Sequence, residues 1–340
     1  MPDVGPLVLG RGAAKESHDA MDSVDIAIRE PDGRRLASRT RLIGYCWAAL
    51  TVSIFAGWFV VTRFSVTREL TIWDITALRF GIGAVLLAPT VLRRGQRLPP
   101  AAWRDGFLFM LLWGVPFVLL VAMGLRLTTA SQAASITPTL MPAFAGLFAW
   151  TFLRERQGRA RWLGYGAIVC GLAGLVTAAA ISHGAPDPAG LVVLAAASAM
   201  WAVYTIIFRR SGVTPIQAAA LICVWSAVTF LPFYVLLGLS RFGVASLGEI
   251  ALQALYQGVL MSGVAIVTFN RSVALLGSGA ASAIIALVPC VATLLAIPIL
   301  GEVPTALEGA AIAVIVAGVL LASKPPSLPA TPSSKKGRRP

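Results

Sequence analysis

The sequence predicts an all-helical membrane protein in which ten transmembrane helices form two inverted five-helix repeats. Three observations predict this fold: an unusually apolar composition, a series of long apolar runs and a pattern that occurs twice. Of the 340 residues, 57% are hydrophobic and 13% are charged, with a mean hydropathy of +0.79. Soluble domains are about half apolar and about a quarter charged. The excess is too large for one or two soluble cores, which excludes soluble enzymes, secreted disulfide scaffolds and disordered proteins.

Apolar runs follow one another from Leu42 onward, each about as long as a helix that crosses a ~30 Å hydrocarbon core. The ten predicted spans are residues 42–62, 71–91, 106–125, 132–153, 162–181, 191–209, 217–237, 254–275, 279–299 and 304–323. Residues 1–41 are polar and aperiodic, so we expect a disordered cytoplasmic tail without a cleavable signal peptide. Residues 324–340, rich in Pro, Ser, Lys and Arg, are expected to form a basic cytoplasmic tail.

The distribution of Lys and Arg predicts the orientation of the chain in the membrane. With the N-terminus inside, the cytoplasmic segments hold basic groups at residues 34–41, 93–104, 154–161, 209–210 and 324–339. The opposite loops hold only Arg63, Arg68, Arg126 and Arg241. Lys and Arg accumulate in cytoplasmic loops, so both termini are expected to be cytoplasmic, in the inner or plasma membrane. This placement accounts for the net charge of +13 without a nucleic-acid partner.

The two halves of the chain share a pattern. Pro142 and Glu155 recur as Pro289 and Glu302, 147 positions later. The first spans of the halves match at an offset of 146, which pairs Phe55 with Trp201 and Trp58 with Tyr204. We therefore predict repeats at residues 42–181 and 187–323. Five spans in each make the second repeat enter the membrane inverted, an architecture of secondary transporters with a substrate site between the repeats.

Five segments carry a resemblance to a known family. They are ITALRF at 75–80, TASQAASITPTLMPAFAGLFAWTFLRE at 129–155, MWAVYTIIFRR at 200–210, LYQGVLMSGVAIVTFN at 255–270 and GSGAASAIIALVPCVATLLAIPILGE at 277–302. With them the chain resembles the EamA-like ten-helix members of the drug/metabolite transporter superfamily, over roughly residues 42–323. LRE at 153–155 departs from the LGE that this family favours. The resemblance implies transport of small metabolites or drugs, commonly export of amino acids or related compounds.

One charged residue lies deep within a predicted span. Arg79 is about eight residues into the second span, ~12 Å from its end at 1.5 Å per residue. Its guanidinium could bind a substrate carboxylate or phosphate. The alternative is a structural arginine that caps carbonyls or pairs with a neighbour, and the family commonly has Arg here whatever the substrate. Asp74, at the outer end of the same helix, is expected to act as an N-terminal cap.

Uncharged candidates for the substrate site come from several spans. Phe55, Trp113, Trp201 and Tyr204 are expected to line a cavity suited to amphipathic ligands, or else to serve as packing or interfacial residues. Gln257 and Asn270 could bind the ligand or join helices, and we favour the second role.

The matched prolines and acids are expected to act at helix kinks and helix ends. Pro142 and Pro289 fall in mid-span, where proline kinks a helix, so they are candidate gating elements. Glu155 and Glu302 should end those helices on opposite sides and pair with nearby loop arginines or cap the next helix.

Residue types that are absent from the predicted spans reduce the number of possible functions. No carboxylate falls at mid-span, the two His lie outside the spans, and the four Cys are isolated, so no metal site, cofactor or catalytic cluster is expected. No Walker A motif is present. We expect a secondary transporter with a small-molecule substrate, embedded in the lipid bilayer as a monomer or homodimer. The alternatives are a passive facilitator or channel and a membrane-embedded lipid-modifying protein.

Overall fold

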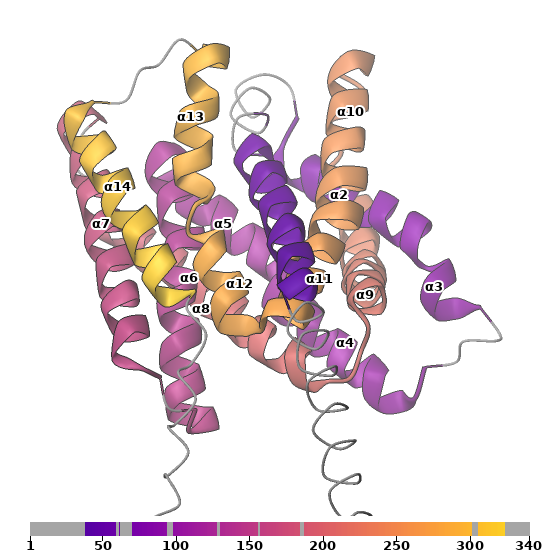
Figure 1. The fold of residues 1–340 in the computed structure, drawn as a ribbon. Coiled ribbons are helices and arrows are strands. Elements are labelled where there is room, and N and C mark those ends of the chain that lie inside the picture. The colour runs from indigo at the N-terminus through magenta and orange to yellow at the C-terminus, as the bar shows by residue number, and fades with distance from the viewer. Residues whose placement is uncertain are drawn as a thin grey trace, which may run out of the picture.

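The computed structural model describes residues 38–58, 61, 70–93, 98–127, 130–155, 157–183, 187–300 and 305–323. Every regular element in these ranges is helical. The elements are a first helix, Ser38–Trp58, followed by α2 Ile72–Leu87, α3 Pro89–Leu92, α4 Pro100–Trp113, α5 Val115–Leu127, α6 Ala130–Leu153, α7 Arg159–His183, α8 Pro188–Arg210, α9 Pro215–Leu236, α10 Leu247–Gln253, η1 Ala254–Ala265, α11 Ile266–Leu276, α12 Ser278–Ile285, α13 Val288–Leu300 and α14 Ala306–Ala322 (Figure 1).

Within the described residues, eight helical stretches are long and apolar enough to cross a membrane. They are Ser38–Trp58, Pro100–Gly124, Ser135–Leu153, Arg159–Ala178, Pro188–Arg210, Pro215–Leu236, Leu247–Leu276 and Ser278–Leu295. They coincide with eight of the ten predicted spans. Of the other two, 304–323 is the shorter helix α14, and 71–91 divides into α2 and α3 at Pro89. The predicted all-helical, multi-pass membrane fold is confirmed.

The two matched prolines differ in their effect on the chain. Pro142 and its neighbour Pro138 lie inside α6, which continues through both. Pro289 lies at the start of α13, after a break at Ala286 and Leu287 that separates α13 from α12. Figure 1 shows the change of direction at this break. Pro289 thus follows a break inside the apolar stretch Ser278–Leu295, whereas α6 shows no break at Pro142, so the two matched prolines are not equivalent.

Helices α7 and α14 show the internal symmetry most directly. A methyl group at Gly171 would lie 2.5 Å from Cγ1 of Ile315, and one at Gly318 would lie 2.9 Å from Cγ1 of Ile168. The two contacts exchange under the 147-residue offset, so the interface has a two-fold relation. Residue numbers rise along α7 as they fall along α14, so these matched helices run antiparallel, as inverted repeats require (Figure 1).

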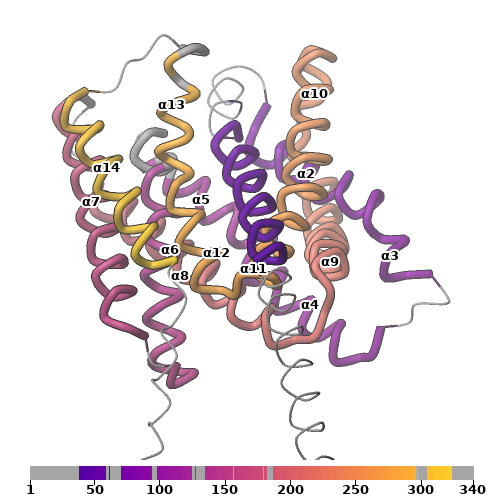
Figure 2. The backbone as a smooth tube through the Cα atoms, viewed as in Figure 1, coloured from indigo at the N-terminus to yellow at the C-terminus, as the bar shows by residue number. Residues whose placement is uncertain are grey.

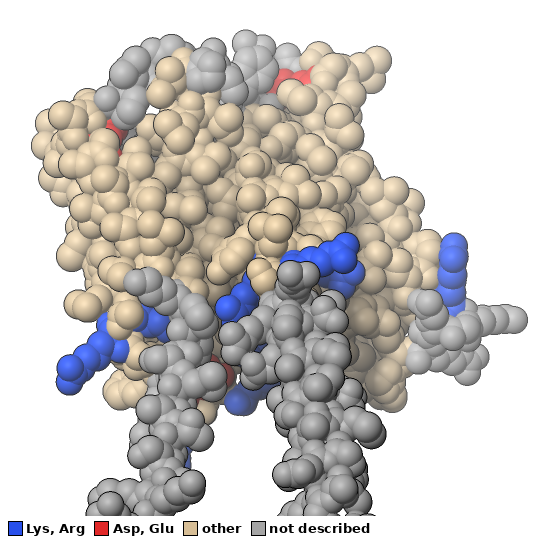
Figure 3. Space-filling view, in the orientation of Figure 1, with Lys and Arg blue, Asp and Glu red and all other residues tan. Residues whose placement is uncertain are grey.

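The surface of the bundle is suited to lipid along its sides. Leu236, Val85 and Ile181 are each at least 76% exposed. On the face drawn in Figure 3, the described Lys and Arg gather at one end. The first helix begins and α14 ends toward that same end (Figure 2).

Candidate functional site

Five aromatic side chains from four helices meet in the interior, and we call them the aromatic cluster: Phe55, Trp113, Trp201, Tyr204 and Phe269. Trp113 stacks on Tyr204 with ring centroids 4.7 Å apart and on Trp201 at 5.4 Å. Phe269 lies 5.1 Å from Trp113. Phe55 meets Trp201 edge-on at 5.5 Å, so these matched positions of the two halves touch. The first and sixth predicted spans therefore face each other in the interior, as expected.

Hydrogen bonds join Tyr204 of the aromatic cluster, and Trp58 outside it, to other helices of the second half. The Tyr204 hydroxyl donates to Oδ1 of Asn270 at 2.7 Å, in a fully buried contact. Nδ2 of Asn270 in turn donates to the carbonyl of Pro215 at 3.4 Å. Gln257 accepts from Nε1 of Trp58 at 3.0 Å, across from the first helix. The described contacts of Asn270 and Gln257 thus join helices, the role favoured from the sequence.

Arg79 lies in the interior beside two helices of the second half. Its side chain is 4% exposed, and its Nε has no hydrogen-bond partner among the described residues. The Arg79 carbonyl accepts a 2.6 Å bond from the Ser262 hydroxyl of η1. Cys223 of α9 lies at the same place, because its Sγ is 3.9 Å from the carbonyl of Ser262 and a methyl group at Gly83 would lie 2.8 Å from it. Cys223 also belongs to the same buried hydrophobic core as the aromatic cluster.

The segment that packs on the Arg79 turn is a twelve-residue π-helix, η1. The Ser262 hydroxyl also lies within hydrogen-bond distance of the carbonyl of Gln257, five residues earlier, at 2.9 Å. The two helices approach so closely that a methyl group at Gly83 would lie 2.7 Å from Cβ of Ser262. π-Helical turns are rare and occur mostly at functional sites, because they re-aim side chains that an α-helix would place elsewhere.

Asp74 is fully buried at the first turn of α2 and fixes one end of the bundle. Its Oδ2 accepts from the backbone N–H of Thr71 at 2.8 Å in a capping box, so the expected capping role is present in this reciprocal form. Its Oδ1 accepts from the Tyr234 hydroxyl at 2.6 Å and from the backbone N–H of Arg241 at 3.0 Å. The carboxylate thus holds α2 against the last turn of α9 and the following loop.

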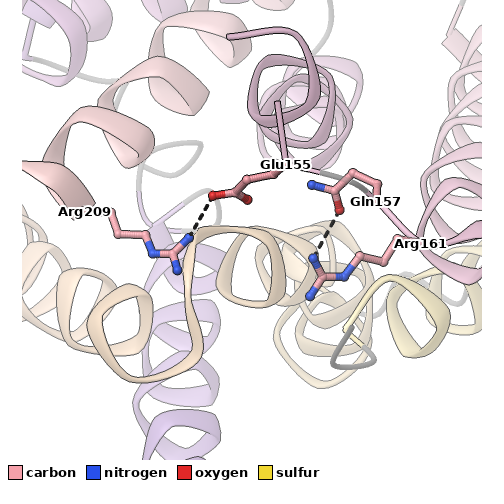
Figure 4. Close-up of polar contacts among 4 residues, drawn as sticks. All are labelled: Glu155, Gln157, Arg161 and Arg209. Carbon is pink, nitrogen blue, oxygen red and sulfur yellow. Dashed lines mark hydrogen bonds and ion pairs between the residues drawn. The ribbon is translucent and has the colours of Figure 1, made fainter. Parts of the chain in front are cut away.

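The other end of the bundle carries a bridge between the halves. Glu155, after the end of α6, pairs with Arg209 in the last turn of α8, with Oε1 and Nη1 3.7 Å apart (Figure 4). The partner that the described residues give Glu155 thus comes from α8, and Arg156, a nearby loop arginine, lies outside the described residues. Arg161 binds Gln157 at 3.1 Å beside this pair. Glu302 lies outside the described residues.

Three residues of this interior were not predicted from the sequence. Ser262 is a small polar residue among many, and only the π-helical register turns its hydroxyl onto Arg79. Cys223 reads as a core hydrophobe. Phe269 lacked a counterpart in the first half, although periodicity along α11 could have placed it on the inner face.

Three comparisons place this architecture among known proteins. The model of the EamA-like transporter family matches residues 42–177 and again residues 188–324. A relative from Streptantibioticus cattleyicolor, named a probable terminal-alkyne amino-acid exporter, is 31% identical over 195 residues; the match spans 56% of this chain and 63% of that protein. A protein of known crystal structure shares the fold, with a TM-score of 0.63 and 24% identity over 84% of this chain and 96% of its own. Because both halves match the family model, the chain is a multi-pass membrane protein that belongs to the EamA-like transporter family.

Proposed function

We propose that the protein is a secondary carrier that exports a small organic metabolite by alternating access. The observation that carries the proposal is the interior site at the junction of the two matched segments, where Arg79 and the aromatic cluster lie. Bridges between the segments lie at both ends of this site, at Asp74 and at Glu155. A site enclosed between two repeats, with contacts at each end that can break in turn, is what alternating access requires.

The substrate we propose is an amino acid or a related compound. The name of the Streptantibioticus cattleyicolor relative supports an amino-acid skeleton and outward transport. The aromatic cluster supports an apolar portion of the ligand, and Arg79 supports an acidic one.

We propose that both termini face the cytoplasm of the inner or plasma membrane. The grouping of basic side chains at one end of the bundle supports this orientation (Figure 3). Each chain contains both halves of the site, so the functional unit is proposed to be a monomer or a homodimer with one pathway in each chain. The proposed partners are the substrate and the bilayer, without nucleic acid.

Counterflow in proteoliposomes tests the proposal. Vesicles are loaded with one class of solute, namely amino acids, small organic acids, nucleosides or cationic dyes, and uptake of the labelled counterpart is followed without an imposed ion gradient. A carrier accumulates label inside the vesicles transiently above its equilibrium level. The reason is that each unlabelled molecule that leaves brings the binding site back to the outer side, where labelled solute binds. A passive channel only equilibrates the label. Equilibration without overshoot would therefore contradict the carrier proposal, and a flat result is repeated with a proton gradient before the substrate panel is widened.

A further inference from the structure

Among the described residues, the charge of Arg79 has no acidic counterpart. Among the elements from α2 onward, α2 packs most extensively against α9 and η1, and neither of these contains Asp or Glu. Within α2 the one acid is Asp74, whose two oxygens already accept bonds from Thr71, Tyr234 and Arg241. A buried cation without a paired anion is costly, and the cost is greatest where lipid surrounds the protein.

The unpaired nitrogens of this interior are donors. Among the described residues, Nε of Arg79 and Nε1 of Trp201 are buried without a hydrogen-bond partner. Two acceptors of this interior are occupied, since Oδ1 of Asn270 accepts from Tyr204 and Oε1 of Gln257 accepts from Trp58. The buried Ser226 hydroxyl, beside Gly114, also has no partner among the described residues, and it can donate as well as accept. Buried donors without a partner can bind an anionic group of a ligand, whereas a cationic group would be repelled by the positive charge of Arg79.

We infer that the site recognises a carboxylate on a compact apolar body, and that an α-ammonium group is not needed for binding. The inference rests on the proposed function and narrows its substrate class. Arg79 pairs with the carboxylate, and the apolar body lies toward the aromatic cluster. Amino acids then bind through their acid end, deaminated acids bind as well, and cationic amphiphiles are excluded.

A matched ligand series tests the inference on purified protein in detergent. The probes are leucine, 4-methylpentanoate and 3-methylbutylamine, which share one apolar body and carry both groups, the acid alone or the amine alone. Binding is followed by the shift in thermal unfolding midpoint and by tryptophan fluorescence. We expect leucine and 4-methylpentanoate to bind within about tenfold of each other, and the amine to bind at least a hundredfold more weakly, in line with the loss of a buried charge pair.

Variants connect the selectivity to Arg79. Arg79→Gln should lose at least tenfold in affinity for 4-methylpentanoate, and Arg79→Lys should recover only part of it because the bidentate geometry is lost. Arg271→Gln, at an exposed arginine of α11, is the matched control and should bind like wild type. If Arg79→Gln does not fold, the ligand series on the wild-type protein still decides the question.

The outcomes separate this inference from the proposed function. Equal or tighter binding of the amine overturns the inference, and so does unchanged acid binding by a folded Arg79→Gln variant. The carrier proposal would still hold in that case if counterflow is seen with another class of solute. Selective acid binding without counterflow supports the inference and contradicts the carrier.

Discussion

At the residue scale, the Asp74 carboxylate is the most heavily engaged polar group in the described interior. It accepts from two backbone N–H groups and from the Tyr234 hydroxyl while fully buried. We expect Asp74→Asn to lower the free energy of unfolding by roughly 2 kcal/mol, because an amide nitrogen replaces an oxygen that donors need. Tyr234→Phe, which removes one bond and keeps the cap, should cost about 1 kcal/mol. Thermal unfolding in detergent measures both, and equal midpoints for Asp74→Asn and wild type would contradict this assignment.

The sequence predicted the residues of the site better than their partners. Arg79 is detectable because a charge eight residues into an apolar run has few explanations. The aromatic residues were detectable because Phe55 aligns with Trp201 in the repeat. The partners of Asp74 and Glu155 were not detectable, because Tyr234 and Arg209 lie on helices that are distant in the chain. Each acid also had possible partners closer in sequence.

At the scale of elements, the α7–α14 interface depends on glycine. We expect Gly171→Ala to destabilise the protein by about 1–3 kcal/mol, because the added methyl group would lie 2.5 Å from Ile315 and 2.9 Å from the carbonyl of Ala311. Gly166→Ala, five residues earlier on α7, meets nothing within 4 Å and should be neutral or slightly stabilising. Unfolding midpoints of the two variants, measured side by side, check the contrast; equal midpoints would mean that the interface is not tightly packed.

The break between α12 and α13 gives a second prediction at this scale. Pro289→Ala restores an N–H at the break and should let the two helices join, so we expect slower turnover with little change in binding. Pro142→Ala should have a smaller effect, because α6 already continues through this position. Single-cycle transport and ligand binding, measured in parallel, check the prediction. A loss of binding with intact turnover would rule out a gating role for Pro289.

Helix number and length were predictable because a bilayer demands long apolar runs, which are strong signals. Local register was not. The π-helical turns of η1 depend on how neighbouring helices pack, and nothing in the apolar pattern of residues 254–265 distinguishes them from regular helix.

At the scale of the whole molecule, bridges between the two matched segments lie at opposite ends of the bundle. Cys223, fully buried near Arg79, is a native reporter for opening at either end. In protein whose other three cysteines are replaced, we expect Arg209→Gln to speed labelling of Cys223 by a membrane-impermeant thiol reagent from the Glu155 side. Tyr234→Phe should speed labelling from the Asp74 side. Unfolding midpoints serve as the control, since the exposed Glu155–Arg209 pair contributes little to stability. Labelling that rises from both sides in either variant would indicate general loosening.

The unpaired charge of Arg79 also has an electrical consequence. Moving one elementary charge through the membrane potential is worth about 2.3 kcal/mol per 100 mV. An empty site would then carry one positive charge through the field, whereas a site holding a monocarboxylate would be neutral. The voltage would act on the return of the empty protein and leave the loaded step nearly untouched. Exchange of one anion for another would therefore run at the same rate in polarised and depolarised vesicles. The rate of net efflux would differ between the two.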